Sequence, residues 1–415
     1  MSQALPPLRR NLDLMPSPAP DRPGLLIRDP FRFAESALII PSPLVPCLAF
    51  FTGEYQRSQV VEALVRLTGD VRVGQVVDHL LDTLSQQGFL DDDVFAGLRE
   101  QRTRAFAEGA ARMAAHAGPA YPADRDALRK VLTRYMDGGD QEPAAPADTG
   151  RLIGVAAPHV SPEGGWRSYR AAYRALGSEH AGRTFVVLGT SHYGEPETFG
   201  LTRKAFLTPL GQAPVDLALV DELVEKGGPA VRLEDYCHSI EHSIEFQVVF
   251  LQHLVGPDVR ILPVLCGPFA RSTREGGWPE DDPAVARFFD ALGALALREQ
   301  QRLLWVLGVD MAHVGRRYGD EFLARADEGV MIEIAQRDRE RCEKIAAGDA
   351  RGLWRLIQDN ADELKWCGAA PLYTFLKAVA PARAGVRRYE QWNIDEGSVV
   401  SFAGIAFYDD APPGV

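Results

Sequence analysis

The sequence predicts an α/β protein with a mainly parallel sheet flanked by helices, and a small, mostly helical domain before it. Two observations support this prediction. Beyond residue 150, short apolar runs alternate with longer amphipathic segments, whereas helical patterns dominate before residue 116. The length of 415 residues also exceeds what one small domain requires. We therefore expect a mobile leader over residues 1–24, an N-terminal module over 25–115 and an α/β domain over 116–415.

The N-terminal module is predicted from two amphipathic patterns, over residues 56–67 and 75–87, followed by a tight turn at Gly88. Two helices and a short turn of this kind resemble a winged-helix module, and the helix pattern with Gly88-Phe89-Leu90 is also similar to the peptide-binding domain of PqqD-like proteins. Residues 54–100 carry nine acidic and four basic side chains, which argues against nucleic-acid binding and favours a peptide or protein partner. A purely structural appendage is the alternative.

The α/β domain is predicted from the order of its elements. The expected strands are residues 152–157, 184–189, 259–265, 303–309 and 399–407. The expected helices between them are residues 166–176, 215–225, 239–254 and 283–298.

Charge and cysteine content restrict the class of protein. A net charge of −12 argues against a nucleic-acid-binding surface, which needs a basic stripe. The five cysteines are scattered and odd in number, which fits a reducing cytoplasm better than a disulfide framework. Arg9-Arg10 precedes no apolar run, and the apolar stretch 37–51 contains three prolines. We expect a cytoplasmic protein without a membrane-spanning segment.

The tetrapeptide His-Ser-Ile-Glu occurs twice in succession over residues 238–245. On a continuous helix, His238, Glu241 and His242 would share one face at i, i+3 and i+4. Two imidazoles and a carboxylate on one face can bind a divalent metal or act as a base beside one. The alternative is a polar helix face whose histidines cap neighbouring loops.

Three further polar motifs follow predicted strands: Pro158-His159, Ser191-His192, and the segment from Asp310 to His313. Ligands of open α/β sheets bind beyond the carboxyl ends of the strands, so these motifs are expected to converge there. Imidazoles suit Fe, Zn, Cu or Ni, and two histidines with one carboxylate favour Fe(II).

A competing interpretation comes from residues 238–242, which match the H-x-x-E-H pattern of zinc proteases, with Glu241 as the base. That interpretation leaves His159, His192 and His313 unexplained.

The order of these motifs resembles the Memo family, most closely its bacterial branch called AmmeMemoRadiSam system protein B. The resemblance covers residues 116–408 and implies a fold similar to class III extradiol dioxygenases. It is carried by Ala157-Pro158-His159, Gly189-Thr190-Ser191-His192, Glu241-His242-Ser243-Ile244-Glu245, Asp310-Met311-Ala312-His313 and Cys367-Gly368.

The resemblance implies that His159 and His192 bind a metal and that His242 lies in the same pocket. Ala312 stands where animal members carry a cysteine ligand. Either His242, His313 or Asp310 supplies the third ligand, or the site is weaker or vacant. Fe(II) is the expected metal, and zinc or copper are alternatives.

Two functions follow from this resemblance. The first is a metal-dependent, dioxygenase-like oxidoreductase in which His242 or His313 acts as a base, Glu241 orients a histidine ring, and Asp310 also belongs to the catalytic group. The second is a non-enzymatic metal- or ligand-binding partner of a radical-SAM enzyme, which it would contact through the N-terminal module.

Other residues have plainer predictions. Cys266, Cys342 and Cys367 are expected to be small buried hydrophobes. Residues 316–318 are expected either to bind an anionic group or to form a solvated loop.

Overall fold

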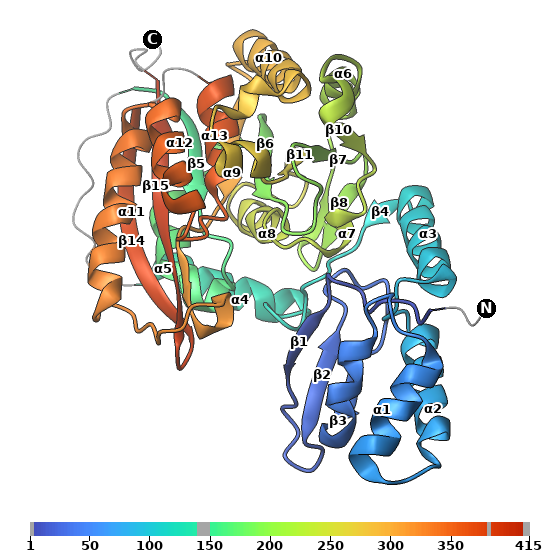
Figure 1. Ribbon diagram of the computed structural model, residues 1–415. Helices are drawn as coiled ribbons and strands as arrows, with labels where there is room; N and C mark the ends of the chain where they lie inside the picture. Colours follow the sequence, from blue (N-terminus) through green and yellow to red (C-terminus); the bar gives the residue numbers. More distant parts are fainter. Residues whose placement is uncertain (1–3, 139–149, 380–382, 410–415) are drawn as a thin grey trace. The chain divides into compact units, whose positions relative to one another are not determined.

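The structure, a computed structural model, describes residues 4–138, 150–379 and 383–409 (Figure 1). The chain divides into two compact units between Glu108 and Gly109. Residues 109–115, which the sequence assigned to the N-terminal module, therefore pack with the second unit. In the part of the chain that is described, no helix has both the length and the apolarity needed to cross a bilayer.

The first unit combines a small antiparallel sheet with three helices. The two predicted helices are confirmed as α1 and α2, and Gly88 lies in the turn after α2 with a φ of 73°. The three strands were not predicted, because each is only four or five residues long. The elements are β1 (Asp13–Pro16), β2 (Gly24–Arg28), β3 (Leu38–Pro41), a 3₁₀ segment (Ser42–Phe50), α1 (Arg57–Thr68), α2 (Val73–Gln86) and α3 (Asp93–Glu108).

Regular structure begins earlier than the sequence suggested. Strand β1 lies within the stretch 1–24 for which a leader was expected, and it pairs with β2. Arg9 is buried, forms an ion pair with Asp29 at 3.0 Å, and donates a hydrogen bond to the carbonyl of Gly88. These long-range contacts order a proline-rich stretch whose composition shows no sign of them. Residues 1–3 of the predicted leader lie outside the described residues.

The second unit is built on a nine-stranded sheet whose four central strands are parallel, in the order β11-β6-β12-β5. The five predicted strands are confirmed within one or two residues of their ends. Antiparallel strands flank the centre on both sides. The sheet comprises β5 (Leu152–Ala157), β6 (Thr184–Thr190), β7 (Phe199–Leu201), β10 (Val231–Leu233), β11 (Arg260–Cys266), β12 (Leu303–Gly308), β13 (His313–Gly315), β14 (Arg383–Asp395) and β15 (Ser398–Tyr408), while β4 (Ala111–Arg112), β8 (Ala205–Thr208) and β9 (Gly211–Ala213) form a separate small sheet.

Helices form two groups against this sheet (Figure 1). In one group, α5 (Pro162–Tyr173) packs on β5, β14 and β15 and α8 (Glu245–Leu254) packs on β12, while α4 (Arg125–Asp137) packs on these two helices. In the other group, α13 (Ala369–Ala378) packs on β6, β11 and β12, and it is covered by α10 (Pro283–Arg298) and α12 (Ala350–Gln358). The remaining helices are α6 (Leu217–Lys226), α7 (Cys237–Ile240), α9 (Ala270–Glu275) and α11 (Val330–Ala346). The α/β class predicted for this part of the chain is confirmed.

Two glycines at the carboxyl ends of the central strands allow another segment to lie directly on them. A Cβ atom at Gly308 would lie 2.0 Å from the carbonyl oxygen of Ser243, and one at Gly189 would lie 2.5 Å from the Ser243 hydroxyl. The missing side chains therefore let the Ser243 backbone touch β12 and the side chains of Ser243 and Ile244 touch β6. This close approach brings the repeated His-Ser-Ile-Glu segment to the strand ends.

We predict that Gly308→Ala destabilises the second unit, because the added methyl group must displace backbone rather than a flexible side chain. The expected loss is about 1–3 kcal/mol, the usual cost of overpacking a tight core. Urea denaturation monitored by circular dichroism measures it. Gly182→Ala is the matched control, since a Cβ there meets nothing within 4 Å and should leave the midpoint unchanged. Equal stability of the two variants would contradict the close-approach argument.

Candidate metal centre

The helix predicted over residues 239–254 is broken in its first part, and this is a correction to the sequence analysis. Helix α7 ends at Ile240, Glu241 adopts extended angles (φ −74°, ψ 141°), and α8 begins only at Glu245. His238, Glu241 and His242 therefore do not share a helical face. The ring of His238 points elsewhere, since its Nε2 lies 3.0 Å from the carbonyl oxygen of Gly200.

The break is stabilised by a buried arginine from β4. The guanidinium of Arg112 donates to the carbonyls of His238 (2.8 Å) and Glu241 (2.7 Å), and it forms an ion pair with Glu245. A carbonyl that accepts from Arg112 no longer needs an amide four residues further along a helix. The amide of His242 instead donates to the Glu241 carboxylate at 2.9 Å.

The Glu245 carboxylate is fully buried and is satisfied by four groups. Besides Arg112, it accepts hydrogen bonds from the amides of Ala115 (2.9 Å) and His116 (3.0 Å) and from the hydroxyl of Tyr121. Burial opposes the charged form, but Arg112 and these donors outweigh it and lower the pKa of Glu245. Glu245, the second glutamate of the repeat, is thus a charged side chain with a structural role, which was not predicted from the sequence.

Three histidines from different parts of the chain converge beyond the strand ends. His159 follows β5, His192 follows β6, and His242 lies in the break between α7 and α8. One ring nitrogen from each lies within 4.8 Å of the other two, which is a group that can hold a metal ion. The rings of His192 and His242 stack at 4.9 Å, and that of His159 stands edge-on to both. The convergence expected from the sequence is thus found, and it includes His242 but not His238.

Hydrogen bonds fix which nitrogen each ring presents. Nδ1 of His159 lies 2.9 Å from the carbonyl oxygen of Gly308, and Nδ1 of His192 and of His242 lie 3.0 and 3.1 Å from the Glu241 carboxylate. Carbonyl and carboxylate oxygens only accept, so each Nδ1 carries the proton. In the neutral form of such a ring Nε2 carries the lone pair, as in metal-binding histidines oriented by an acceptor behind them.

Glu241 is the charged centre behind the histidines. Its buried carboxylate accepts from the amides of His192 (2.9 Å) and His242 and from both ring nitrogens. Burial opposes its ionisation, yet His192 and the hydrogen bonds outweigh it and hold the pKa of Glu241 well below its usual range. In the same way Glu241 raises the pKa of His192 against the effect of burial. Burial, reinforced by the two other rings, keeps the pKa of His159 well below its usual value.

Asp310 and His313 both lie near this centre, outside the three-histidine group. Oδ1 of Asp310 accepts from the amide of His159 at 2.9 Å, and Oδ2 lies 3.4 Å from His159 Nε2. Burial raises the pKa of Asp310 to about 7. Nδ1 of His313 lies 3.0 Å from the carbonyl of Met311, its ring packs against Tyr318, and burial lowers its pKa to about 4. Ala312 between them is fully buried and offers no donor side chain.

Cys367 was predicted to be a small buried hydrophobe, and the structure places it beside the three-histidine group. Its Sγ lies 3.2 Å from His159 Nε2, and the residue is half-buried. The carbonyl of Cys367 accepts from the Thr190 hydroxyl at 2.9 Å, which ties its loop to the end of β6. Cys266 and Cys342 are buried as predicted. The residues around Cys367 do not distinguish its thiol from the other cysteines. The Cys367-Gly368 motif of the family resemblance was the signal in the sequence that pointed to this position.

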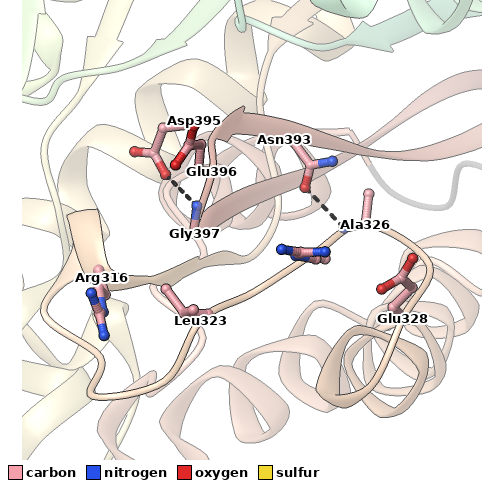
Figure 2. Close-up of a pocket in the computed structure, with 9 residues that line it drawn as sticks. Arg316, Leu323, Ala326, Glu328, Asn393, Asp395, Glu396 and Gly397 are labelled. Carbon is pink, nitrogen blue, oxygen red and sulfur yellow. Dashed lines mark hydrogen bonds between the residues drawn. The ribbon is translucent and has the colours of Figure 1, made fainter.

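A pocket of about 1190 Å³ lies away from the three histidines, between the chain after β13 and the turn joining β14 and β15. Figure 2 shows Arg316, Glu328 and Asp395 around it, with Asn393 accepting from the amide of Ala326. Arg316 is thus a pocket residue, whereas Tyr318 packs on His313. The pocket is lined by both basic and acidic side chains, so its charge does not indicate whether it would bind an anion or a cation.

Comparison with known proteins identifies the family. A family model described as Memo-like protein matches residues 112–406. The chain belongs to this family. A MEMO1 family protein of Aquifex aeolicus is 25% identical over 391 residues, covering 92% of this chain and 96% of that protein. Another, from Thermococcus kodakarensis, is 28% identical over 253 residues, covering 60% and 81%. A solved structure of an uncharacterized protein from Escherichia coli K12 reaches a TM-score of 0.39 at 14% identity, covering 62% of this chain and 99% of its own.

The match to the Memo-like family begins at Arg112, the residue that clamps the broken segment, and it includes all three histidines. Residues 1–108 lie outside the family model, whereas the match to the Aquifex aeolicus protein, which covers 92% of this chain, extends into them.

We predict that Arg112→Ala destabilises the second unit by about 3–5 kcal/mol, the cost of leaving a buried charge unpaired at Glu245. Chemical denaturation measures the loss. Arg298→Ala is the control, because its ion pair with Glu222 is solvent-exposed on the arginine side and its removal should change stability little. An Arg112→Ala protein as stable as the Arg298→Ala protein would show that Arg112 does not clamp the segment.

Proposed function

We propose that this protein holds a divalent transition metal through Nε2 of His159, His192 and His242, with Fe(II) as the expected metal and zinc or copper as alternatives. The observation that carries this proposal is that three imidazoles, each with its Nδ1 proton donated elsewhere, bring their ligand atoms within 4.8 Å of one another. Imidazole suits all three of these metals.

The electrostatics support a cation rather than a purely structural cluster. Three lone pairs facing one another repel unless a proton or a metal lies between them. Burial and the neighbouring rings keep the pKa of His159 low, which disfavours a proton there. The buried charge of Glu241 behind two of the rings makes the same space favourable for a cation.

For the chemistry we propose a metal-dependent, dioxygenase-like oxidoreductase activity, related to the extradiol dioxygenases. The metal would supply the binding and activation of dioxygen and substrate. With His242 as a ligand, the proton-handling groups would be Asp310 and His313. Asp310, whose pKa is raised to about 7, can give or take a proton near neutral pH, whereas neutral His313 can accept a hydrogen bond from substrate.

A second proposal is that the protein is a non-enzymatic partner of a radical-SAM enzyme and contacts it, or a peptide, through a winged-helix-like N-terminal module. The supporting observation is that residues 1–108 form a compact unit outside the family match. A deletion that tests this proposal must stop at Glu108, because removal of Arg112 would disturb the metal centre. Capture of a radical-SAM enzyme by the full chain but not by residues 109–415 would support it. Equal capture by both would contradict it.

We predict near-stoichiometric metal in protein purified anaerobically without an affinity tag, measured by inductively coupled plasma mass spectrometry. The double variant His159→Ala/His192→Ala should contain almost none, because two of the three ligands are lost. His253→Ala is the matched control, since His253 lies at the end of α8 outside the three-histidine group. Equal metal in wild type and double variant would refute the proposed centre.

We also predict that Glu241→Gln lowers metal affinity about 10–100-fold, the usual cost of losing a partner that orients metal-binding histidines. The amide retains the shape but loses the charge. Both rings share Oε1 and the amide of His192 donates to Oε2, so an NH2 group at either position removes an acceptor. Competition with a chelating dye measures the affinity. The exposed Glu195→Gln is the control and should bind metal like the wild type. Unchanged affinity in Glu241→Gln would remove this carboxylate from the centre.

A further inference from the structure

Asp338 is a fully buried carboxylate in α11 that has no role in the function proposed so far. Nε1 of Trp366 donates a hydrogen bond to its Oδ1 at 2.7 Å, and the hydroxyls of Tyr389 and Ser401 donate to Oδ2 at 2.8 and 2.6 Å. Burial raises the pKa of Asp338, while these donors and the buried Arg341 favour its charged form. A buried carboxylate with three donors from three other segments fixes the position of each segment relative to α11.

One of these donors is also bonded to the segment that carries His313. The Oγ of Ser401 accepts a hydrogen bond from the amide of Ala312 at 2.9 Å. The backbone of Ser401 pairs with the same segment, since its carbonyl accepts from the amide of Met311 and its amide donates to the carbonyl of Ala312. Because the Ser401 hydroxyl gives its proton to Asp338, its lone pairs are left for the Ala312 amide. Asp338 therefore sets the direction of the hydroxyl that anchors this segment.

A second donor holds the loop before α13, which lies on the other side of the same histidine. Trp366 is 1% exposed, and its indole nitrogen is the group that donates to Asp338. Two residues earlier in the loop, the carbonyl of Leu364 accepts from the amide of His313 at 2.8 Å. The anchored indole therefore fixes the backbone at Leu364 and Lys365 against the histidine.

His313 lies where these two segments meet, and its ring is held by one carbonyl from each. Its Nδ1 lies 3.0 Å from the carbonyl oxygen of Met311 and 3.2 Å from that of Lys365. Both oxygens only accept, so the ring proton is on Nδ1 and Nε2 carries the lone pair. Burial lowers the pKa of His313 to about 4, so the ring is neutral at pH 7. A shift of either carbonyl would weaken the preference for this tautomer.

We propose that Asp338 is a positioning residue, which fixes the tautomer and the orientation of the His313 ring. It acts through Ser401 on one side and through Trp366 on the other. The inference rests on the proposed function for the use of this ring, in which neutral His313 accepts a hydrogen bond from substrate. A ring protonated on Nδ1 offers the lone pair of Nε2 for that bond, whereas the other tautomer has a proton there and cannot accept.

Two variants remove the positioning, and a third is the matched control. In Asp338→Asn the amide oxygen stays with the indole of Trp366, so its NH2 group faces the two hydroxyls and no longer accepts from them. Ser401→Ala removes one arm without altering the carboxylate. Tyr389→Phe also removes a hydrogen bond from Asp338. Among the described residues, however, no hydrogen bond joins the Tyr389 hydroxyl to the segments around His313, and it accepts instead from Gln391 of the same strand.

The test is nitrogen-15 NMR of the full chain, labelled only in its nine histidines, at pH 7 and without added metal. His313→Gln assigns the signals of the His313 ring. The wild type should show the two ring-nitrogen shifts of the form protonated on Nδ1. Asp338→Asn and Ser401→Ala should move both shifts toward the average of the two tautomers, and Tyr389→Phe should keep the wild-type values. A loss of stability alone does not change the tautomer of a folded protein, so this measurement isolates positioning.

Addition of Zn²⁺ to the same samples separates this inference from the proposed function. Shifts in the ring signals of His159, His192 and His242 would support the metal centre, and no response there would refute it without affecting the result for His313. An unchanged tautomer in both Asp338→Asn and Ser401→Ala would overturn the positioning role, as would an equal change in Tyr389→Phe. A wild-type His313 protonated on Nε2 would overturn it as well, so a folding defect in a variant does not remove the test.

Discussion

The buried ion pair between Arg112 and Glu245 is the interaction on which the rest of the centre depends. Removing both charges from water is costly and is repaid only when every remaining donor and acceptor is satisfied. Here Glu245 has two amides and a hydroxyl besides the arginine, and Arg112 has two carbonyls besides the glutamate. Those two carbonyls belong to the segment between α7 and α8. The pair therefore stabilises a break in the helix, and the break positions Glu241 and His242.

This arrangement gives the two glutamates of the repeated tetrapeptide different tasks. Glu245 faces the arginine and holds the backbone, whereas Glu241 faces the histidines and sets their tautomers. Gly189 and Gly308 allow the same segment to lie on the strand ends, so the Glu241 carboxylate reaches rings contributed by two separate elements. A regular helix would have placed both carboxylates and both histidines on overlapping faces, with neither task fulfilled.

Some parts of the site follow from residues that are neighbours in the sequence, and others depend on contacts between residues far apart in the sequence. Strands β5, β6 and β12 are continuous apolar runs, and the polar residues directly after them had to meet at one edge of a parallel sheet. His159 and His192 were predictable for that reason. The break before His242 was not, because the residue that stabilises it is Arg112, more than 120 positions away in the sequence. The contact between Cys367 and His159 was likewise not predicted from local sequence, since the two residues are 208 positions apart.

The charges around the centre determine what a bound divalent cation would require there. Three neutral imidazoles bring no charge, and Glu241 contributes one buried negative charge. A divalent cation would therefore leave one uncompensated positive charge in a largely dehydrated space, which is unfavourable. Asp310 lies close enough to help, but burial raises its pKa to about 7, so near neutral pH its proton is only partly lost. An anionic ligand, such as a deprotonated substrate group or a hydroxide ion, would supply the missing negative charge, and the cation, Glu241 and that ligand would together be neutral.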